Sequence, residues 1–202
     1  FLLRTKFGLK FIDSFSKKHR ELIKILGYIG IGIGFVGMVF ISFILIKNLY
    51  DVTFVPGAQS AVTPALPGVK VPGSPIFIPL IGGWIALFIV TLVHEFSHGI
   101  VASSHGLKIK SSGVAFFGPI MGAFVEPDEK KMERKTDVAK YSIYAAGPFS
   151  NILLTIVALV LLLVVASPLL NLMTVADGFS FQGVTEGLPA DLAGVMPDAV
   201  FT

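Results

Sequence analysis

The stretch that decides the fold is TLVHEFSHGIVA, residues 91–102. Three ionisable residues, His94, Glu95 and His98, stand in it with apolar neighbours on both sides. The stretch belongs to an apolar segment, residues 76–103, which is long enough to cross a hydrocarbon core of about 30 Å. Ionisable side chains at membrane depth are costly, and they mark functional sites by default. The sequence therefore predicts a transmembrane helix that carries a polar functional site.

The composition is that of a membrane protein. Of the 202 residues, 53% are hydrophobic and 14% are charged, whereas soluble domains average about 25% charged residues. The mean hydropathy is +0.81. Because the chain has no cysteine, histidines and carboxylates are the candidate metal ligands. The basic residues form no basic face interleaved with aromatic residues, so we expect no nucleic-acid partner.

Three apolar segments predict three transmembrane helices, at residues 25–46, 76–103 and 141–173. The last of these is longer than a straight span needs, so we expect it to tilt, to kink or to begin outside the bilayer. Five glycines of the first segment predict close helix packing on one side: Gly27, Gly30, Gly32, Gly34 and Gly37.

The segments around the predicted spans differ in character. Residues 1–24 are basic and amphipathic, which predicts a helix at the cytosolic membrane interface. Residues 47–75 are rich in proline and glycine and predict an outer loop without regular structure. Residues 104–140 combine a charged, cytosol-like stretch with a short apolar run.

That apolar run, residues 114–125, is too short to span a membrane as a helix. Gly118 and Pro119 divide it into two short strands, so the sequence predicts a membrane-associated β-hairpin. The hairpin either lies on the membrane surface or is embedded, and an embedded hairpin needs cover from the surrounding protein.

The distribution of lysine and arginine predicts the orientation in the membrane. Residues 1–24 and 105–140 carry seven of these residues each, residues 48–75 carry one and residues 173–202 carry none. Since positive charge favours the cytosolic side, we expect a cytosolic N-terminus and an extracytoplasmic C-terminal part. The chain is then an integral membrane protein, of the cell membrane if it is prokaryotic.

The spacing of the two histidines indicates a metal site. His94 and His98 lie one turn apart on one helix face. Two imidazoles suit Zn²⁺, and a third protein ligand leaves one position open for water. Glu95 can take a proton from that water and return it to a leaving group, which is metal-assisted hydrolysis. His105 follows two serines and precedes a glycine, so we interpret it as a helix-end residue rather than a ligand.

These motifs resemble the site-2 proteases, a family of zinc-dependent intramembrane metalloproteases. The resemblance rests on HEFSHG at 94–99 and on AAGPFSN at 145–151, which is similar to the family's Gly-x-x-x-Asn motif. GAFVEPDE at 122–129 resembles the archaeal and eukaryotic-like branch. The resemblance implies an endopeptidase with Zn²⁺ as cofactor. Its substrate would be a single-pass membrane protein, cleaved within the lipid bilayer as in regulated intramembrane proteolysis.

The AAGPFSN stretch offers further candidates for the site. Gly147 and Asn151 lie four residues apart on one helix face; Gly147 allows close approach, and Pro148 kinks the helix or begins it. An amide in an apolar span needs a partner. Asn151 either forms a helix–helix hydrogen bond or, as the resemblance implies, faces the active site and binds substrate backbone or an oxyanion. The resemblance also implies a third zinc ligand, an aspartate of a Leu-Asp-Gly motif on a later span, which we expect beyond Thr202.

Residues 174–202 look like the start of an extracytoplasmic PDZ-like domain, incomplete here, which would bind peptides. The overall expectation is an all-α polytopic membrane protein with three transmembrane helices, the short hairpin and this domain start. One alternative function is a catalytically inactive membrane scaffold that binds partners through the PDZ domain. Another is a membrane peptidase of the prenyl-protein protease type, although such enzymes lack the AAGPFSN pattern. The PDZ-like pattern consists of Val184, Gly187, Pro189, Ala190, Ala193, Gly194 and Asp198.

Overall fold

The computed structural model describes residues 2–6, 8–56, 58, 60, 66–70, 77–117, 120–173, 179–180, 194 and 200–201. The chain divides into two compact units, Phe1–Thr155 and Ile156–Thr202. The first unit contains the candidate site.

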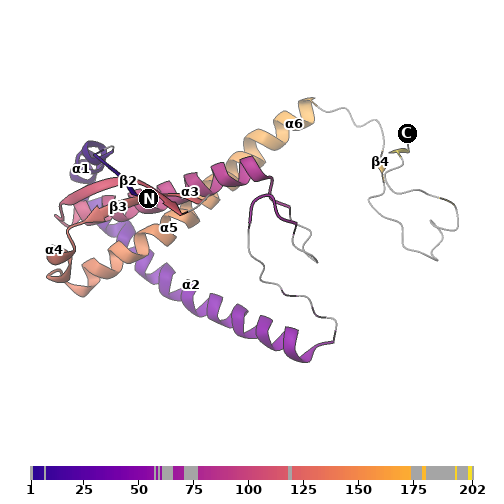
Figure 1. The fold of residues 1–202 in the computed structure, drawn as a ribbon, viewed down its shortest axis with the longest axis horizontal. Helices are drawn as coiled ribbons and strands as arrows, with labels where there is room; N and C mark the ends of the chain where they lie inside the picture. Colours follow the sequence, from indigo (N-terminus) through magenta and orange to yellow (C-terminus); the bar gives the residue numbers. More distant parts are fainter. Residues whose placement is uncertain are drawn as a thin grey trace. The chain divides into compact units, whose positions relative to one another are not determined.

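Three long apolar helices dominate the chain (Figure 1). Each is long and apolar enough to cross a membrane, which confirms the three predicted helices and the membrane class of the protein. Large side chains such as Phe40 and Ile81 are exposed on them, as expected of a surface that faces lipid. The helices are α2 (Arg20–Phe54), α3 (Leu80–Ser104) and a third made of α5 (Asp137–Leu161), the π-helical turn η1 (Leu162–Ala166) and α6 (Ser167–Met173).

The third helix resolves the position of Pro148, which the sequence left open. It starts at Asp137, before the apolar segment, and Pro148 lies inside α5 rather than at its start. The π-helical turn begins at Leu162, where the regular helical hydrogen-bond ladder shifts by one residue.

The N-terminal part differs from the single helix expected over residues 1–24. It forms strand β1 (Leu2–Thr5), then helix α1 (Leu9–Lys18), and the chain enters α2 at Arg20. The first residues are extended because β1 pairs antiparallel with a distant strand, with Thr5 opposite Ser112. This long-range pairing gives the backbone groups of residues 2–5 partners that a local pattern does not reveal. The amphipathic helix is therefore confined to α1.

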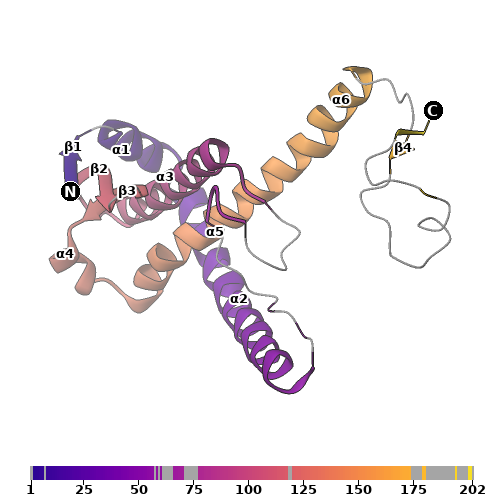
Figure 2. The same ribbon diagram turned by 45° about the vertical axis from the view of Figure 1, so that its right-hand side comes forward.

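The predicted hairpin is confirmed and belongs to a three-stranded antiparallel sheet. Its strands are β2 (Ile109–Phe117) and β3 (Ile120–Pro127), and the strand order is β1-β2-β3. The turn residues Gly118 and Pro119 lie outside the described residues. Figures 1 and 2 both show the sheet beside α3. A Cβ atom on Gly99 of α3 would touch Val125 of β3. The hairpin is thus covered by protein on its α3 face.

The buried core lies where α2, α3 and α5 meet. Gly27 and Gly30 of α2 are buried there, against Ser142 and Phe149 of α5. A Cβ on Gly37 would have no described neighbour within 4 Å. The predicted close packing therefore holds for the first turns of α2. The core residues are Ile23, Val101, Ala102, Leu107, Ile143 and Ala146.

Between residues 174 and 202 the described part consists of β4 (Phe179–Ser180), paired with β5 (Val200–Phe201), and Gly194. Most of the expected PDZ-like pattern lies outside the described residues, so the PDZ-like domain stays a prediction. Helix α4 (Glu129–Glu133) connects the sheet to α5.

Candidate metal centre

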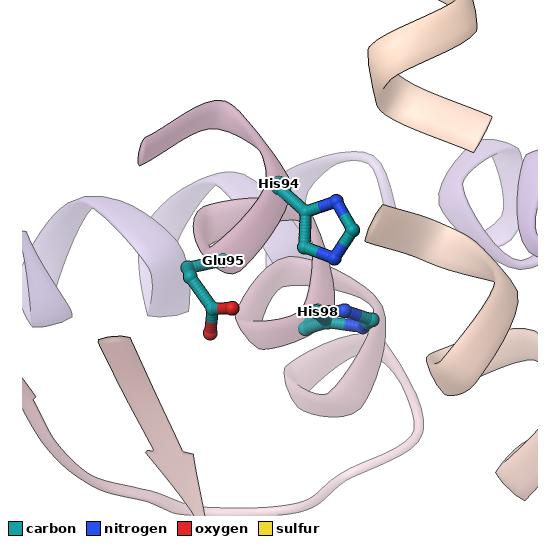
Figure 3. A group of neighbouring side chains, drawn as sticks. All are labelled: His94, Glu95 and His98. Carbon is teal, nitrogen blue, oxygen red and sulfur yellow. The ribbon is translucent and has the colours of Figure 1, made fainter. Parts of the chain in front are cut away.

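Helix α3 brings the three residues of the motif together. One ligand atom of each of His94, Glu95 and His98 lies within 4.8 Å of the others. The two imidazoles are 4.8 Å apart between ring centroids and meet edge to face, with an interplanar angle of 77°. Figure 3 shows both rings extending from one side of α3, with the Glu95 carboxylate beside them. At about 1.5 Å per residue, His94 lies roughly 21 Å from the start of α3 and 15 Å from its end.

Helix α5 faces this group through a glycine. A Cβ atom on Gly147 would collide with Nε2 of His94 and with Nε2 of His98. Both Nε2 atoms therefore point into the same narrow space, which exists because position 147 has no side chain. This donor set fits Zn²⁺, which takes imidazole nitrogens at about 2.0–2.1 Å.

The other ring nitrogen of His98 identifies its ligating atom. His98 Nδ1 lies 2.6 Å from the carbonyl oxygen of Ile143. A carbonyl oxygen only accepts hydrogen bonds, so Nδ1 carries the proton and donates it. When the imidazole is neutral, Nε2 then has the free lone pair that a metal requires.

Asn151 lies at Nδ1 of His94, as the Ile143 carbonyl lies at Nδ1 of His98. Its side-chain nitrogen lies 3.0 Å from Nδ1 of His94. Its Oδ1 atom is buried and has no hydrogen-bond partner among the described residues. Gly147 and Asn151, both selected from the sequence, thus lie directly against the histidine pair, one helical turn apart. Pro148 adjoins Gly147 in α5, but no described contact joins it to the histidines.

His105 lies apart from the metal group, at the C-terminal end of α3, as the sequence predicts. Its Nε2 is 2.9 Å from Oγ of Ser142, and that hydroxyl donates to the carbonyl of Ala139 at 2.8 Å. The hydroxyl therefore accepts from Nε2–H. Burial and the nearby charges of Lys24, Lys135 and Arg20 lower the pKa of His105. The ring therefore stays neutral to lower pH than a free imidazole does, and its bond to Ser142 joins the end of α3 to α5.

Two of these cations also bind the end of α3. Arg20 Nε donates to the carbonyl of Ser104 at 2.9 Å, and Lys135 Nζ donates to the carbonyl of His105 at 2.7 Å. Positive charge at a helix C-terminus is stabilising. These bonds fix the helix that carries the histidines. Sequence reasoning missed both roles, as well as the Ile143 carbonyl, which is a backbone group that no side-chain pattern identifies.

Known proteins provide an independent comparison. The family model of peptidase family M50 matches residues 82–196, which include the histidine motif and all of α5. An uncharacterized protein of Methanocaldococcus jannaschii is 37% identical over 166 residues, which are 80% of this chain and 42% of that protein. The chain thus spans less than half the length of this relative. No solved structure matches. With the family match over the helices that build the site, the chain belongs to peptidase family M50, the site-2 protease family.

Proposed function

We propose that the protein is an intramembrane zinc endopeptidase that cleaves transmembrane segments of single-pass membrane proteins. The observation that carries this proposal is the pair of histidine Nε2 atoms that face the gap at Gly147, beside Glu95, on an apolar helix. Membership of a peptidase family supports the reaction class, and the apolar helices support a substrate in the bilayer.

The residues of α3 and α5 have different roles in the proposed reaction. His94 and His98 hold the metal, and the third ligand is an aspartate expected beyond Thr202. Zinc, when bound, supplies a Lewis acid that favours deprotonation of water near neutral pH. Glu95 accepts a proton on its carboxylate and returns it to the nitrogen of the leaving amine. Gly147 keeps the metal space open and Asn151 contacts His94 from α5, and Pro148 would support the site only indirectly, as the neighbour of Gly147 in α5.

A transmembrane substrate has to unwind before it is cleaved, because a helix engages its own carbonyl groups. The described sheet offers a place for the unwound peptide. β1 covers one edge of β2, so β3 is an edge strand whose outer side has no strand partner among the described residues. A Cβ on Gly122 of β3 would lie 3.7 Å from Thr91, less than one turn before His94. An extended peptide paired with β3 would therefore run alongside the metal helix.

The charge distribution supports the proposed orientation. Arg20, Lys24 and Lys135 gather around His105 at the end of α3. Positive residues favour the cytosolic side, so α3 runs from the outside inward and water reaches the site from the cytosol. In this orientation residues 174–202 lie outside, where a PDZ-like domain would bind peptides.

The test is cleavage of a single-pass membrane protein by the full-length protein in detergent or vesicles. Glu95→Gln keeps the size of the side chain but removes the proton acceptor, so we expect cleavage to fall by about 100- to 10,000-fold. Zinc content should stay unchanged. Glu129→Gln, the same substitution on the exposed helix α4, is the matched control and should cleave normally. Equal cleavage by wild type and Glu95→Gln would reject the assignment, and no cleavage by wild type on any membrane substrate would favour the scaffold.

A further inference from the structure

The two histidines of the metal group are held by the same helix in two different ways. Ile143, Gly147 and Asn151 follow one another at four-residue steps along one face of α5. His98 pairs with Ile143 and His94 with Asn151, so α3 and α5 run antiparallel, and Gly147 lies between the two pairs. Each histidine thus has one nitrogen toward the metal space and the other toward a partner on α5.

The Ile143 carbonyl can only accept a hydrogen bond, so it permits one tautomer of His98. The Asn151 amide can donate or accept, so it permits either tautomer of His94. An asparagine amide presents either its oxygen or its nitrogen to a neighbour, and turning the amide over exchanges the two. If the nitrogen donates to His94 Nδ1, the proton of a neutral ring lies on Nε2. That tautomer cannot bind a metal through Nε2, the atom that faces Gly147.

The direction of His94 Nε2 favours the other orientation of the Asn151 amide, because Nε2 faces the gap at Gly147 and needs a free lone pair to bind a metal there. Oδ1 has no hydrogen-bond partner among the described residues, although it is buried. Rotation of the amide by half a turn places this oxygen 3.0 Å from His94 Nδ1, the position the nitrogen now occupies. Oδ1 then accepts from Nδ1–H, and Nε2 carries a free lone pair, as it does in His98. A single rotation therefore makes both histidines competent ligands, while the amide nitrogen takes the buried position at which the oxygen has no partner.

We propose that Asn151 is a positioning residue: its side-chain oxygen accepts a hydrogen bond from His94 Nδ1 and holds this ligand in the metal-binding tautomer. Asn151 then acts on the metal ligand and not on the substrate or an oxyanion. The assignment deepens the proposed function and rests on it, because it presumes that His94 binds the metal. Residues that orient metal-binding histidines in this way influence metal affinity by about 10- to 100-fold.

The test compares zinc affinity, measured by chelator competition, among variants of the full-length protein. Asn151→Leu keeps the approximate size but removes the acceptor, and we expect zinc to bind about 10- to 100-fold more weakly. Asn151→Asp keeps an acceptor at the same place and should retain affinity. Ser150→Ala is the control, because the hydroxyl of Ser150 donates to the carbonyl of Gly147 in its own helix and forms no described hydrogen bond with either histidine. Circular dichroism verifies folding, and Asn151→Ala replaces the leucine variant if that variant does not fold.

The cleavage rate at saturating zinc separates positioning from a role in the reaction. If Asn151 positions His94, the Asn151→Leu variant should recover most of its kcat once zinc is in excess. Wild-type zinc affinity combined with a lost kcat would overturn the proposal in favour of contact with the substrate. Equal loss of affinity in the leucine and aspartate variants would overturn it in favour of simple packing. These outcomes are independent of the Glu95→Gln experiment, whose failure would reject the peptidase assignment itself.

Discussion

Replacing Gly147 with alanine is the most direct test of the metal space. The new methyl group would collide with Nε2 of both His94 and His98. Carbon and nitrogen atoms in ordinary contact lie about 3.5 Å apart or more, so either α5 retreats by about 1 Å or the imidazoles rotate away. Both responses move the ligand atoms, and the methyl group also occupies the space that the metal needs.

The size of the effect follows from this displacement. Zinc–nitrogen bonds are about 2.0–2.1 Å long, so a shift of about 1 Å removes at least one ligand from coordination. We therefore expect Gly147→Ala to weaken zinc binding by at least about 100-fold, which corresponds to about 2.8 kcal/mol. Cleavage should fall by at least the same factor, while the helix content stays that of the wild type.

The assay is zinc affinity by chelator competition on purified full-length protein, with cleavage measured in parallel. Gly37→Ala is the matched control, because it adds the same methyl group to α2 where no described atom beyond its chain neighbours and its own helix backbone lies within 4 Å. Alanine is also the better helix former by about 0.5–1 kcal/mol, so this control should be as stable as wild type or more stable. Zinc affinity of Gly147→Ala equal to that of wild type would refute the reasoning, because the gap between α3 and α5 would then not limit the site.

Two further predictions concern the sheet and the end of α3. Phe124→Pro removes a backbone donor from the edge strand β3, so it should slow cleavage while the zinc content stays unchanged. Phe124→Ala keeps the N–H group and is the control. Unimpaired cleavage by the proline variant would count against edge pairing. Burial and nearby cations lower the pKa of His105 in the native state from its ordinary value of 6.5. Below about pH 6.5 the unfolded state therefore takes up the proton first, and the native state loses stability as the pH falls. His105→Gln keeps a donor for Ser142 but does not titrate, so its thermal unfolding midpoint should change less between pH 7 and pH 5 than that of wild type; parallel pH profiles would contradict this assignment.

The sequence predicted those parts of the fold that local patterns encode. Uninterrupted apolar length predicted the three long helices, and the division of residues 114–125 at Gly118 and Pro119 predicted the hairpin. The strand β1 was missed, because its pairing with β2 joins residues more than a hundred positions apart. Local periodicity cannot report such a partner, so the N-terminal segment was expected to be helical throughout.

The candidate site was also predicted only in part, because side-chain motifs are visible in the sequence and backbone contacts are not. Side-chain identity and helical spacing selected His94, Glu95 and His98, and the family resemblance added Gly147 and Asn151 to the site. The structure brings these five residues together. The Ile143 carbonyl was missed, because every residue carries this group and its role depends only on which helix face meets His98. The bonds from Arg20 and Lys135 to the end of α3 were missed for a related reason, since both cations occur in segments whose charge was interpreted as membrane orientation.

The histidines fit within an apolar helix because their ring nitrogens are turned toward α5 rather than lipid. Nδ1 of each histidine has a partner on α5, and the hydroxyl of Ser97 donates to the carbonyl of Val93 in its own helix. The remaining Nε2 atoms face the gap at Gly147, where a metal would take their lone pairs. The exposed apolar side chains in the first half of α3, such as Ile81 and Ile85, can then contact the bilayer without exposing the histidines to it. Filling the gap at position 147 would therefore remove the metal without disturbing the lipid-facing surface. A single methyl group on residue 147 would leave α3 and α5 packed together but without space for a metal between them.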